Sequence, residues 1–448
     1  MLDLLIKNGT LVDGHGSRRG SIGVSGSRIV ARYASGEELP QAREVVDADG
    51  LLVLPGVVDP HVHFYGEGIG EYSRLAVRGG VTTFMGMIRG APEVPLAQVV
   101  AEHRRDGDNA SVTDFSFHVV LYDREDTIAQ IAGLAAQGFR SYKMFMAYKR
   151  RGMMASDAFL FSAMEEIHRL GGIALIHAEH GESIDYLELA AMEQGRVAVE
   201  CYEPTRPAEA EAAAIEIVAL AAQSTGCPAY IVHLSSSLGL AAIERARRRG
   251  VPLWAETCPQ YVLMGDDALR DHGAAAKIAP PLRGPADRRS LATAILTGAV
   301  NTIGSDHASY SAAAKQEGGG DIFAAPFGMS GAPILWPAMF TWAQDAGVPL
   351  PVLVRAMCET PARLFGLAHR KGTLAPGADA DMMLVDPVLR KQVDMALVSP
   401  HACPNPMAAK ALAGWPTMTI SRGSVVWRDG EVIGAPGRGE LIEQVRSQ

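Results

Sequence analysis

The chain has 448 residues, enough for one large barrel with a smaller companion or for two to three domains of average size. Hydrophobic residues make up 48% and charged residues 20% of the sequence, as in proteins with an ordinary buried core. The formal net charge of -9 argues against nucleic acid or an anionic membrane surface as a partner. Basic residues gather only in short clusters, at 149–151 and 245–249, which we interpret as solvated surface.

The cysteines and the first residues indicate a cytoplasmic protein. The five cysteines are odd in number and lack CxxC spacing, so we expect reduced thiols. The opening MLDLLIKNGTLVDG has an acid at position 3 and no long apolar core, unlike a secretion signal. No apolar run approaches the ~20 residues needed to span a bilayer.

Both ends of the chain are predicted to be β-rich. Residues 1 to about 50 alternate short apolar runs with NG, DG and SG turn signals, a pattern typical of antiparallel strands and hairpins. The same pattern returns in DADMMLVDP (379–387) and in the stretch 418–440. We therefore expect residues 1–54 and 371–448 to form one small β-sandwich domain beside a central domain of residues 55–370.

The central segment alternates apolar β runs with longer helical patterns, such as 207–223 and 238–249. The expected strands are 53–58, 81–87, 115–120, 138–145, 173–177, 229–233, 251–256 and 301–305. Eight strand-helix units predict an α/β fold, a parallel (β/α)8 TIM-like barrel with its chemistry at the carboxyl ends of the strands. A doubly wound open sheet is the alternative, but it needs a Gly-rich phosphate turn where this chain has DPHVHF (59–64).

Polar side chains gather at the ends of these expected strands. His61 and His63 have the i, i+2 spacing that places two side chains on one face of an extended chain, where both can bind one cation. Each residue alone has an ordinary explanation, such as a half-buried histidine or a helix-capping aspartate. A lysine within an apolar strand is less ordinary, since a buried ammonium is unfavourable unless it is paired or neutralised. Together they indicate a metal site, and the full set is His61, His63, Lys143, His177, His233 and Asp306.

Motifs along nearly the whole chain resemble those of one enzyme family. They are KNGTLVD, PGVVDPHVHF, GGVTTF, SYKMFMAYK, HAEH, VHLSS, ETCPQY, PPLR, SDHA, PARLFGL, ADADMMLVDP and SRGSVV. The sequence resembles the cyclic amidohydrolases of the amidohydrolase superfamily, nearest to the D-hydantoinase and dihydropyrimidinase group, with allantoinases and dihydroorotases more distant. The run KMFMAYK together with ETCPQY is specific to this group within the superfamily.

The resemblance implies a centre of two divalent metal ions, most often Zn2+. His61, His63 and Asp306 would bind one ion, and His177 and His233 the other. Lys143 would be carboxylated by carbon dioxide to N6-carboxylysine and bridge the two. This is physically consistent, because a carbamate turns a buried cation into an oxygen donor.

The resemblance also implies a reaction and substrate contacts. A hydroxide shared by both ions would attack a cyclic amide or imide carbonyl, with Asp306 as general base and then acid. Tyr148 would stabilise the oxyanion. Substrate contacts are expected at Tyr148, Tyr65, Arg89, Ala279 and Phe327, although Arg89 is equally consistent with a plain surface residue. Relatives imply a small-molecule partner and a homo-oligomer, a tetramer or a dimer.

Departures from the family pattern leave the substrate open. Tyr65 stands where dihydroorotases have a carboxylate-binding arginine, and GMIRG (86–90) replaces their MPN motif, which disfavours dihydroorotate. Tyr65, Gly86 and Met87 also depart from hydantoinases. An allantoinase-like or dihydroorotase-like enzyme, or another amide or lactone hydrolase with the same centre, remains an alternative. A non-catalytic scaffold relative is less consistent, because all six ligand positions hold competent residues.

Overall fold

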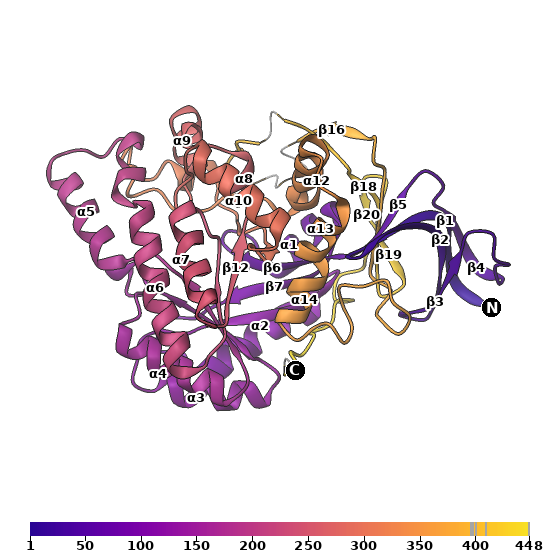
Figure 1. Cartoon of the computed structure of the whole chain (residues 1–448), viewed down its shortest axis with the longest axis horizontal. Coiled ribbons are helices and arrows are strands. Elements are labelled where there is room, and N and C mark those ends of the chain that lie inside the picture. Colours follow the sequence, from indigo (N-terminus) through magenta and orange to yellow (C-terminus); the bar gives the residue numbers. More distant parts are fainter. Residues whose placement is uncertain (395–397, 399–400, 408–409, 447–448) are drawn as a thin grey trace.

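Two nine-stranded sheets organise the chain (Figure 1). The computed structural model describes residues 1–394, 398, 401–407 and 410–446. Strands from the two ends of the chain, indigo and yellow in Figure 1, lie together at one side of the molecule, and the helices of the central segment lie at the other. Among the described residues, no helix combines the length and the apolar character that a bilayer crossing requires.

The first sheet is built from both ends of the chain, as predicted. Its strands are β1 (Leu2–Asp13), β2 (Gly16–Ser25), β3 (Arg28–Ala34), β4 (Ala42–Asp47), β5 (Leu52–Pro55), β15 (Met382–Val385), β18 (Pro416–Ser421), β19 (Ser424–Arg428) and β20 (Glu431–Val432). The order is β20-β19-β18-β15-β5-β1-β2-β3, with β4 paired to β1. The junction between the two ends is the antiparallel pair of β5 and β15. Apolar side chains from both ends, such as Ile6, Val53 and Met382, share one buried core. A separate two-stranded sheet joins β16 (Arg390–Gln392) and β17 (Ala411–Ala413).

The second sheet is a closed parallel barrel. Its strands are β6 (Val57–His63), β7 (Val81–Ile88), β8 (Asp114–Val120), β9 (Ser141–Phe145), β10 (Ile173–His177), β11 (Ala229–Ile231), β12 (Leu253–Thr257), β13 (Thr302–Ile303) and β14 (His307–Ala308). β13 and β14 are successive parts of one stretch of chain, and they pair with β12 and β6 respectively. The sheet therefore closes on itself, which confirms the (β/α)8 prediction and excludes the open doubly wound sheet.

Helices alternate with the barrel strands and cover the barrel (Figure 1). They are α1 (Ile69–Ala76), α2 (Leu96–Ala110), α3 (Thr127–Ala136), α4 (Asp157–Arg169), α5 (Gly181–Glu193), α6 (Ala208–Thr225), α7 (Ser237–Arg248), α8 (Pro259–Leu263), α9 (Asp267–His272), α10 (Pro285–Thr297), α11 (Ala312–Lys315), α12 (Leu335–Ala346), α13 (Leu350–Val354) and α14 (Thr360–Leu364). Shorter helical turns are η1 (Val77–Gly79), η2 (Lys149–Arg151), η3 (Val199–Cys201), η4 (Glu203–Thr205), η5 (Gly273–Ala276), η6 (Ala332–Ile334) and η7 (Arg355–Glu359). The helices expected at 207–223 and 238–249 correspond to α6 and α7, with boundaries one or two residues away.

One predicted strand is wrong in its extent. The expected strand 53–58 is two strands, since β5 ends at Pro55 in the first sheet and β6 begins at Val57 in the barrel. The intervening Gly56 donates its backbone N–H to the Asp381 carbonyl, at 3.0 Å. The apolar run is continuous in sequence, but the chain changes pairing partners in the middle of it, and local periodicity does not record that change.

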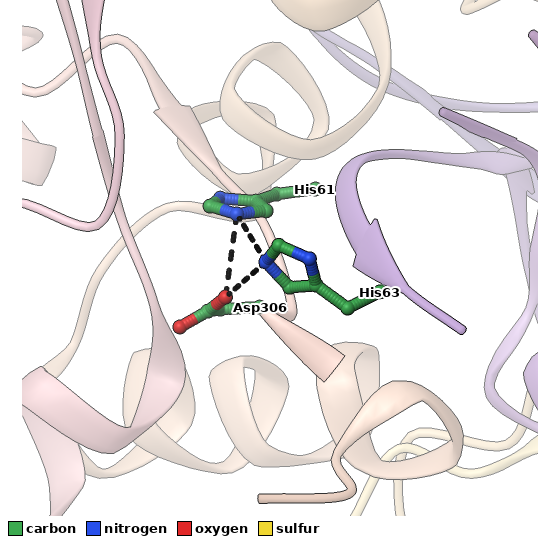
Figure 2. A group of neighbouring side chains, drawn as sticks. All are labelled: His61, His63 and Asp306. Atoms are coloured by element: carbon green, nitrogen blue, oxygen red, sulfur yellow. Dashed lines mark hydrogen bonds and ion pairs between the residues drawn. The ribbon is translucent and has the colours of Figure 1, made fainter. Parts of the chain in front are cut away.

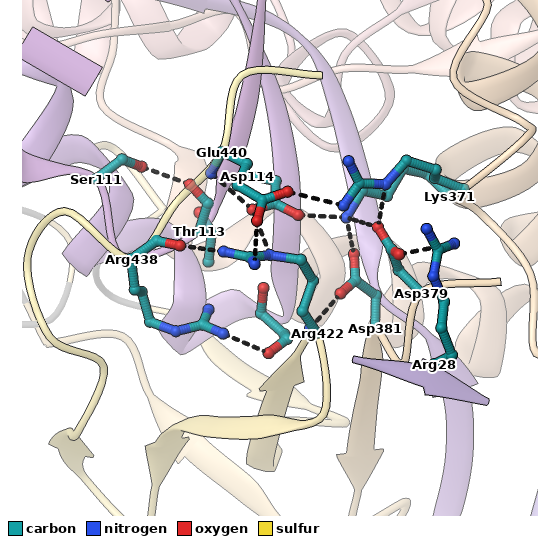
Figure 3. A network of polar contacts seen from close by, with 12 residues as sticks. Arg28, Ser111, Thr113, Asp114, Lys371, Asp379, Asp381, Arg422, Arg438 and Glu440 are labelled. Carbon is teal, nitrogen blue, oxygen red and sulfur yellow. Dashed lines mark hydrogen bonds and ion pairs between the residues drawn. The ribbon is translucent and has the colours of Figure 1, made fainter. Parts of the chain in front are cut away.

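A buried ionic cluster joins the two sheets (Figure 3). The Lys371 ammonium lies 2.8 Å from carboxylate oxygens of both Asp379 and Asp381, and it also contacts Asp114 at the start of β8. Arg422, which follows β18, forms an ion pair with Asp114 at 3.0 Å. The cluster therefore connects the amino-terminal end of a barrel strand to the sheet built from the two chain ends.

Candidate metal centre and cavity

Three predicted ligands meet at the carboxyl end of β6. The Nε2 atoms of His61 and His63 lie 3.2 Å apart, and Asp306 Oδ1 lies 3.3 Å from the first and 3.4 Å from the second. Figure 2 shows the three side chains pointing toward one another. Donors bound to one tetrahedral zinc ion at about 2.0–2.1 Å lie roughly 3.3–3.4 Å from each other. The spacing of these three atoms therefore fits a shared metal ion.

The other two predicted histidines form a second pair. His177, the last residue of β10, faces His233 beyond the end of β11, with 2.9 Å between His177 Nδ1 and His233 Nε2. The two pairs adjoin, since the His61 and His233 ring centres are 5.5 Å apart.

Two buried glutamates orient these imidazoles. The Glu256 carboxylate lies 2.7 Å from His61 Nδ1 and accepts the backbone N–H of His233 at 3.0 Å. The Glu179 carboxylate lies 2.7 Å from His177 Nε2. A carboxylate that accepts one ring N–H leaves the other ring nitrogen with its lone pair free. The free nitrogens are then His61 Nε2 and His177 Nδ1, the atoms that face the other candidate ligands.

Lys143, in β9, is fully buried at the same place. Among the described residues its Nζ has no hydrogen-bond partner. Burial lowers the Lys143 pKa to about 7, although the carboxylates of Asp306 and Glu256 oppose the shift. An unpaired amine in a dry site is unfavourable as an ammonium but reactive when neutral. This environment fits an amine that becomes a carbamate ligand.

The protonation states also suit metal binding. Burial lowers the pKa of all four imidazoles, and for His61 and His233 it does so by a wide margin. Burial alone would raise the Asp306 pKa, but His61 and His63 outweigh it and hold this pKa below its ordinary value. Neutral imidazoles and an ionised carboxylate are the forms that bind metal ions.

Backbone strain is concentrated at the same place. Six non-glycine residues among those described have positive φ, and three of them are Tyr148 (68°), His233 (40°) and Asp306 (48°). Residues in the left-handed region cost of order 1–3 kcal/mol and cluster at functional sites. Here the three strained residues all follow strand ends and line one cavity.

A cavity of about 200 Å3 opens above the candidate ligands. All five predicted substrate contacts line it, namely Tyr65, Arg89, Tyr148, Ala279 and Phe327. The Tyr148 ring centre lies 4.8 Å from that of His177. Burial raises the Tyr148 pKa well above its ordinary value, so its hydroxyl keeps its proton and is available as a donor.

Sequence reasoning missed several residues of the site. The interpretation of 149–151 as solvated surface agrees with the structure, in which all three side chains are exposed. Sequence reasoning did not recognise that Arg151 also lines the cavity, whereas Lys149 and Arg150 form ion pairs with Glu182 and Asp185 on α5. Tyr310 also lines the cavity, and Glu179 and Glu256 were not recognised as partners of the histidines. The only signal in the sequence for Glu179 and Glu256 is their position in HAEH and ETCPQY, two of the motifs that carry the family resemblance.

Comparisons with known proteins place the chain in one enzyme family. A sequence model of the amidohydrolase family matches residues 52–426. The chain is 30% identical over 460 residues to a D-hydantoinase of Geobacillus stearothermophilus, covering 99% of this chain and 96% of the relative. It is 31% identical over 455 residues to a D-phenylhydantoinase of Escherichia coli O9:H4 (strain HS), covering 98% of each. The crystal structure of a dihydropyrimidinase from Brevibacillus agri NCHU1002 superposes with a TM-score of 0.96 at 28% identity, covering 100% of both chains.

Proposed function

The chain belongs to the amidohydrolase family, and we propose that it is a metal-dependent cyclic amidohydrolase that opens a ring amide or imide of the hydantoin or dihydropyrimidine type. The names of its hydantoinase and dihydropyrimidinase relatives support this reaction class. The single observation that carries the proposal is the arrangement of two groups of metal-binding side chains beside one unpaired buried lysine, at the floor of a small cavity.

Members of this family use a binuclear metal centre, and the residues present fit one. We propose that His61, His63 and Asp306 hold one ion, that His177 and His233 hold the other, and that Lys143 contributes as N6-carboxylysine. The imidazole-rich ligand set favours Zn2+. When bound, the ions would polarise the substrate carbonyl and lower the pKa of the attacking water.

The reaction is a hydrolysis, and its proton transfers are assigned to this chain's own residues. The water oxygen forms a bond to the ring carbonyl carbon, the ring C–N bond breaks, and the leaving nitrogen gains a proton. We propose that the Asp306 carboxylate accepts the proton of the attacking water and then delivers it to that nitrogen. The Tyr148 hydroxyl donates to the carbonyl oxygen as negative charge develops on it. Glu256 and Glu179 hold their imidazoles in one tautomer throughout.

Metal analysis and a substrate screen test the proposal together. Purified protein supplied with zinc and bicarbonate should retain about two ions per chain. It should also hydrolyse at least one of hydantoin, dihydrouracil, allantoin, dihydroorotate or a cyclic imide. Less than about one ion per chain after reconstitution, with no ring opened, would contradict the proposal. Turnover of a simple lactone or an acyclic amide alone would instead assign the same centre to a different substrate class.

Three further assignments are proposed for the whole protein. The five free thiols support a reducing, cytoplasmic location. Family analogy supports a homo-oligomer, a dimer or a tetramer. We also propose the division into residues 1–54 and 371–448 as one domain and 55–370 as the other, which is supported by the sheet to which most strands of each segment belong.

A further inference from the structure

We propose that the natural substrate carries an anionic substituent on its ring, a carboxylate being the simplest, and that Arg89 and Arg151 bind it. This inference rests on the proposed ring-opening function and adds a substrate class to it. It also assigns a role to Arg151, a residue for which the sequence indicated only a surface position.

The wall of the cavity is unevenly charged. Among the described residues, Asp306 is the only acidic residue that lines it, whereas Arg89 and Arg151 are both basic. Asp306 is already engaged by the imidazoles of His61 and His63. The outer cavity therefore presents guanidinium groups without a matching carboxylate.

Arg89 lines the cavity at the end of a barrel strand, with its side chain exposed. It directly follows β7, and its guanidinium carbon lies 5.0 Å from the centre of the Tyr65 ring. That ring stacks on the candidate ligand His63, with centres 5.1 Å apart and planes within 7°. The only polar side-chain contact of Arg89 in the described structure is a 3.5 Å approach of Nη1 to Met153 Sδ. Its remaining N–H groups are available to a ligand.

Arg151 lines the same cavity beside a second group of aromatic rings, with its side chain exposed. It ends η2, and its guanidinium carbon lies 4.6 Å from the centre of the Phe327 ring and 5.8 Å from that of Tyr148. Its neighbours in sequence, Lys149 and Arg150, both form ion pairs with acids on α5. Within the described part of the chain, Arg151 forms none. The turn thus directs two basic side chains to acids and the third to the cavity.

Both guanidiniums belong to the wall of one cavity, which Tyr65 and Tyr310 also line. Burial raises the pKa of the Tyr310 hydroxyl to about 12, and the positive charges of Arg89 and Arg151 both oppose that shift. The Tyr310 and Tyr65 rings stack with centres 5.5 Å apart. Two like charges near one pair of rings repel each other, and a bound anion would remove that repulsion. The planar guanidinium fork also matches a carboxylate in geometry.

The test compares two substrates that differ only in charge. Zinc-loaded enzyme is assayed with racemic hydantoin-5-acetic acid and with hydantoin-5-acetamide, which have the same ring and nearly the same size. We expect kcat/KM to be at least roughly tenfold higher for the acid, because charge-assisted hydrogen bonds to guanidinium exceed neutral ones. Sodium chloride should reduce this preference by screening partly exposed charges.

Variants identify the groups responsible. Arg89→Gln and Arg151→Gln should each reduce the acid-to-amide ratio of kcat/KM several-fold, and the double variant should bring it close to one. Lys149→Gln is the matched control, because Lys149 pairs with Glu182 outside the cavity, and it should leave the ratio unchanged. Arg89→Lys keeps the charge but not the fork, and should keep part of the preference. Zinc content reports whether each variant retains its fold.

The outcomes separate this inference from the proposed function. If none of hydantoin, dihydrouracil, allantoin, dihydroorotate and a cyclic imide is opened, the proposed function is wrong, and the inference is wrong with it. If one of these is opened but hydantoin-5-acetic acid is not, only the inference is overturned. If the acetamide is opened as readily as the acid, only the inference is overturned. It is also overturned if the double variant keeps the full preference for the acid.

Discussion

At the scale of single residues, the environment of Lys143 is the hardest to explain if its amine remains unmodified. Its amine is fully buried and has no hydrogen-bond partner among the described residues, although the carboxylates of Asp306 and Glu256 act on its pKa from nearby. A purely structural lysine in such a position would normally be paired, because an unpaired buried ammonium is strongly unfavourable. The proposed reaction with carbon dioxide would convert this amine into a carboxylate-like oxygen donor suited to metal ions.

Replacing Lys143 with Ala should abolish ring opening and deplete the protein of metal. The reason is that the oxygen donors of the proposed carbamate would be lost while the imidazole pairs remain. A short carboxylic acid such as acetate or propionate should restore part of the activity by occupying the space left by the side chain. Metal content and turnover, each with and without the acid, are the measurements.

The control is Lys149→Ala, at an exposed lysine a few residues away, which should behave like the unaltered protein. Full metal retention and activity in Lys143→Ala would exclude the carbamate bridge.

The sequence revealed the candidate ligands but not the residues that support them. His61, His63, Lys143 and His177 lie within or at the ends of strands whose apolar pattern is visible locally, so their convergence could be predicted. Arg151 could not be predicted, because its direction depends on a turn that begins at Tyr148 with φ of 68°. Glu179 and Glu256 could not be predicted as partners, because their roles depend on ring nitrogens whose orientation only the folded chain defines.

At the level of elements, the change from β5 to β6 determines where the barrel begins. The local sequence pattern predicts one strand across this point, where the structure has two. For the barrel strands that lie between clear turn signals, the predicted bounds are within a few residues of the observed ones. The two short strands are separated by Gly56, which is packed directly against Thr82 of β7. A Cβ at Gly56 would lie 2.0 Å from Thr82 Oγ1 and 2.4 Å from Thr82 Cγ2.

Gly56→Ala should therefore destabilise the protein by about 1–3 kcal/mol through overpacking. Gly133→Ala is the matched control, since Gly133 is exposed in α3 and a Cβ there would meet nothing within 4 Å. That change should be neutral or stabilising by up to about 1 kcal/mol, because alanine is the better helix former. Urea unfolding of both variants measures the difference. Equal stability of the two would show that the contact with Thr82 relaxes without penalty.

On the scale of the whole molecule, the cluster around Lys371 connects segments far apart in sequence (Figure 3). Asp114 comes from the barrel, Asp379 and Asp381 lie just before β15, and Arg422 follows β18. Sequence pattern predicted that the two chain ends meet, but not what joins them to the barrel. A lysine and an aspartate 257 residues apart have no shared local signal.

Replacing Lys371 with Met should lower the free energy of unfolding by about 3–5 kcal/mol, because it leaves buried carboxylates without their cation. Burial disfavours the ammonium, but Asp381, Asp114 and Asp379 outweigh burial and raise the Lys371 pKa above its ordinary value of 10.5. A group whose pKa is raised on folding contributes its full stability below its unfolded pKa and loses it as the pH rises through the folded pKa. The difference in unfolding free energy between the unaltered protein and the variant should therefore be constant from about pH 7 to pH 10 and shrink above about pH 10.5.

Urea unfolding across this pH range measures that difference. Lys391→Met is the control, because Lys391 is an exposed lysine of β16, and we expect it to change the free energy of unfolding by no more than about 0.5 kcal/mol. A loss below about 1 kcal/mol at pH 7 would mean that Arg422 and the other neighbouring cations neutralise the carboxylates without Lys371.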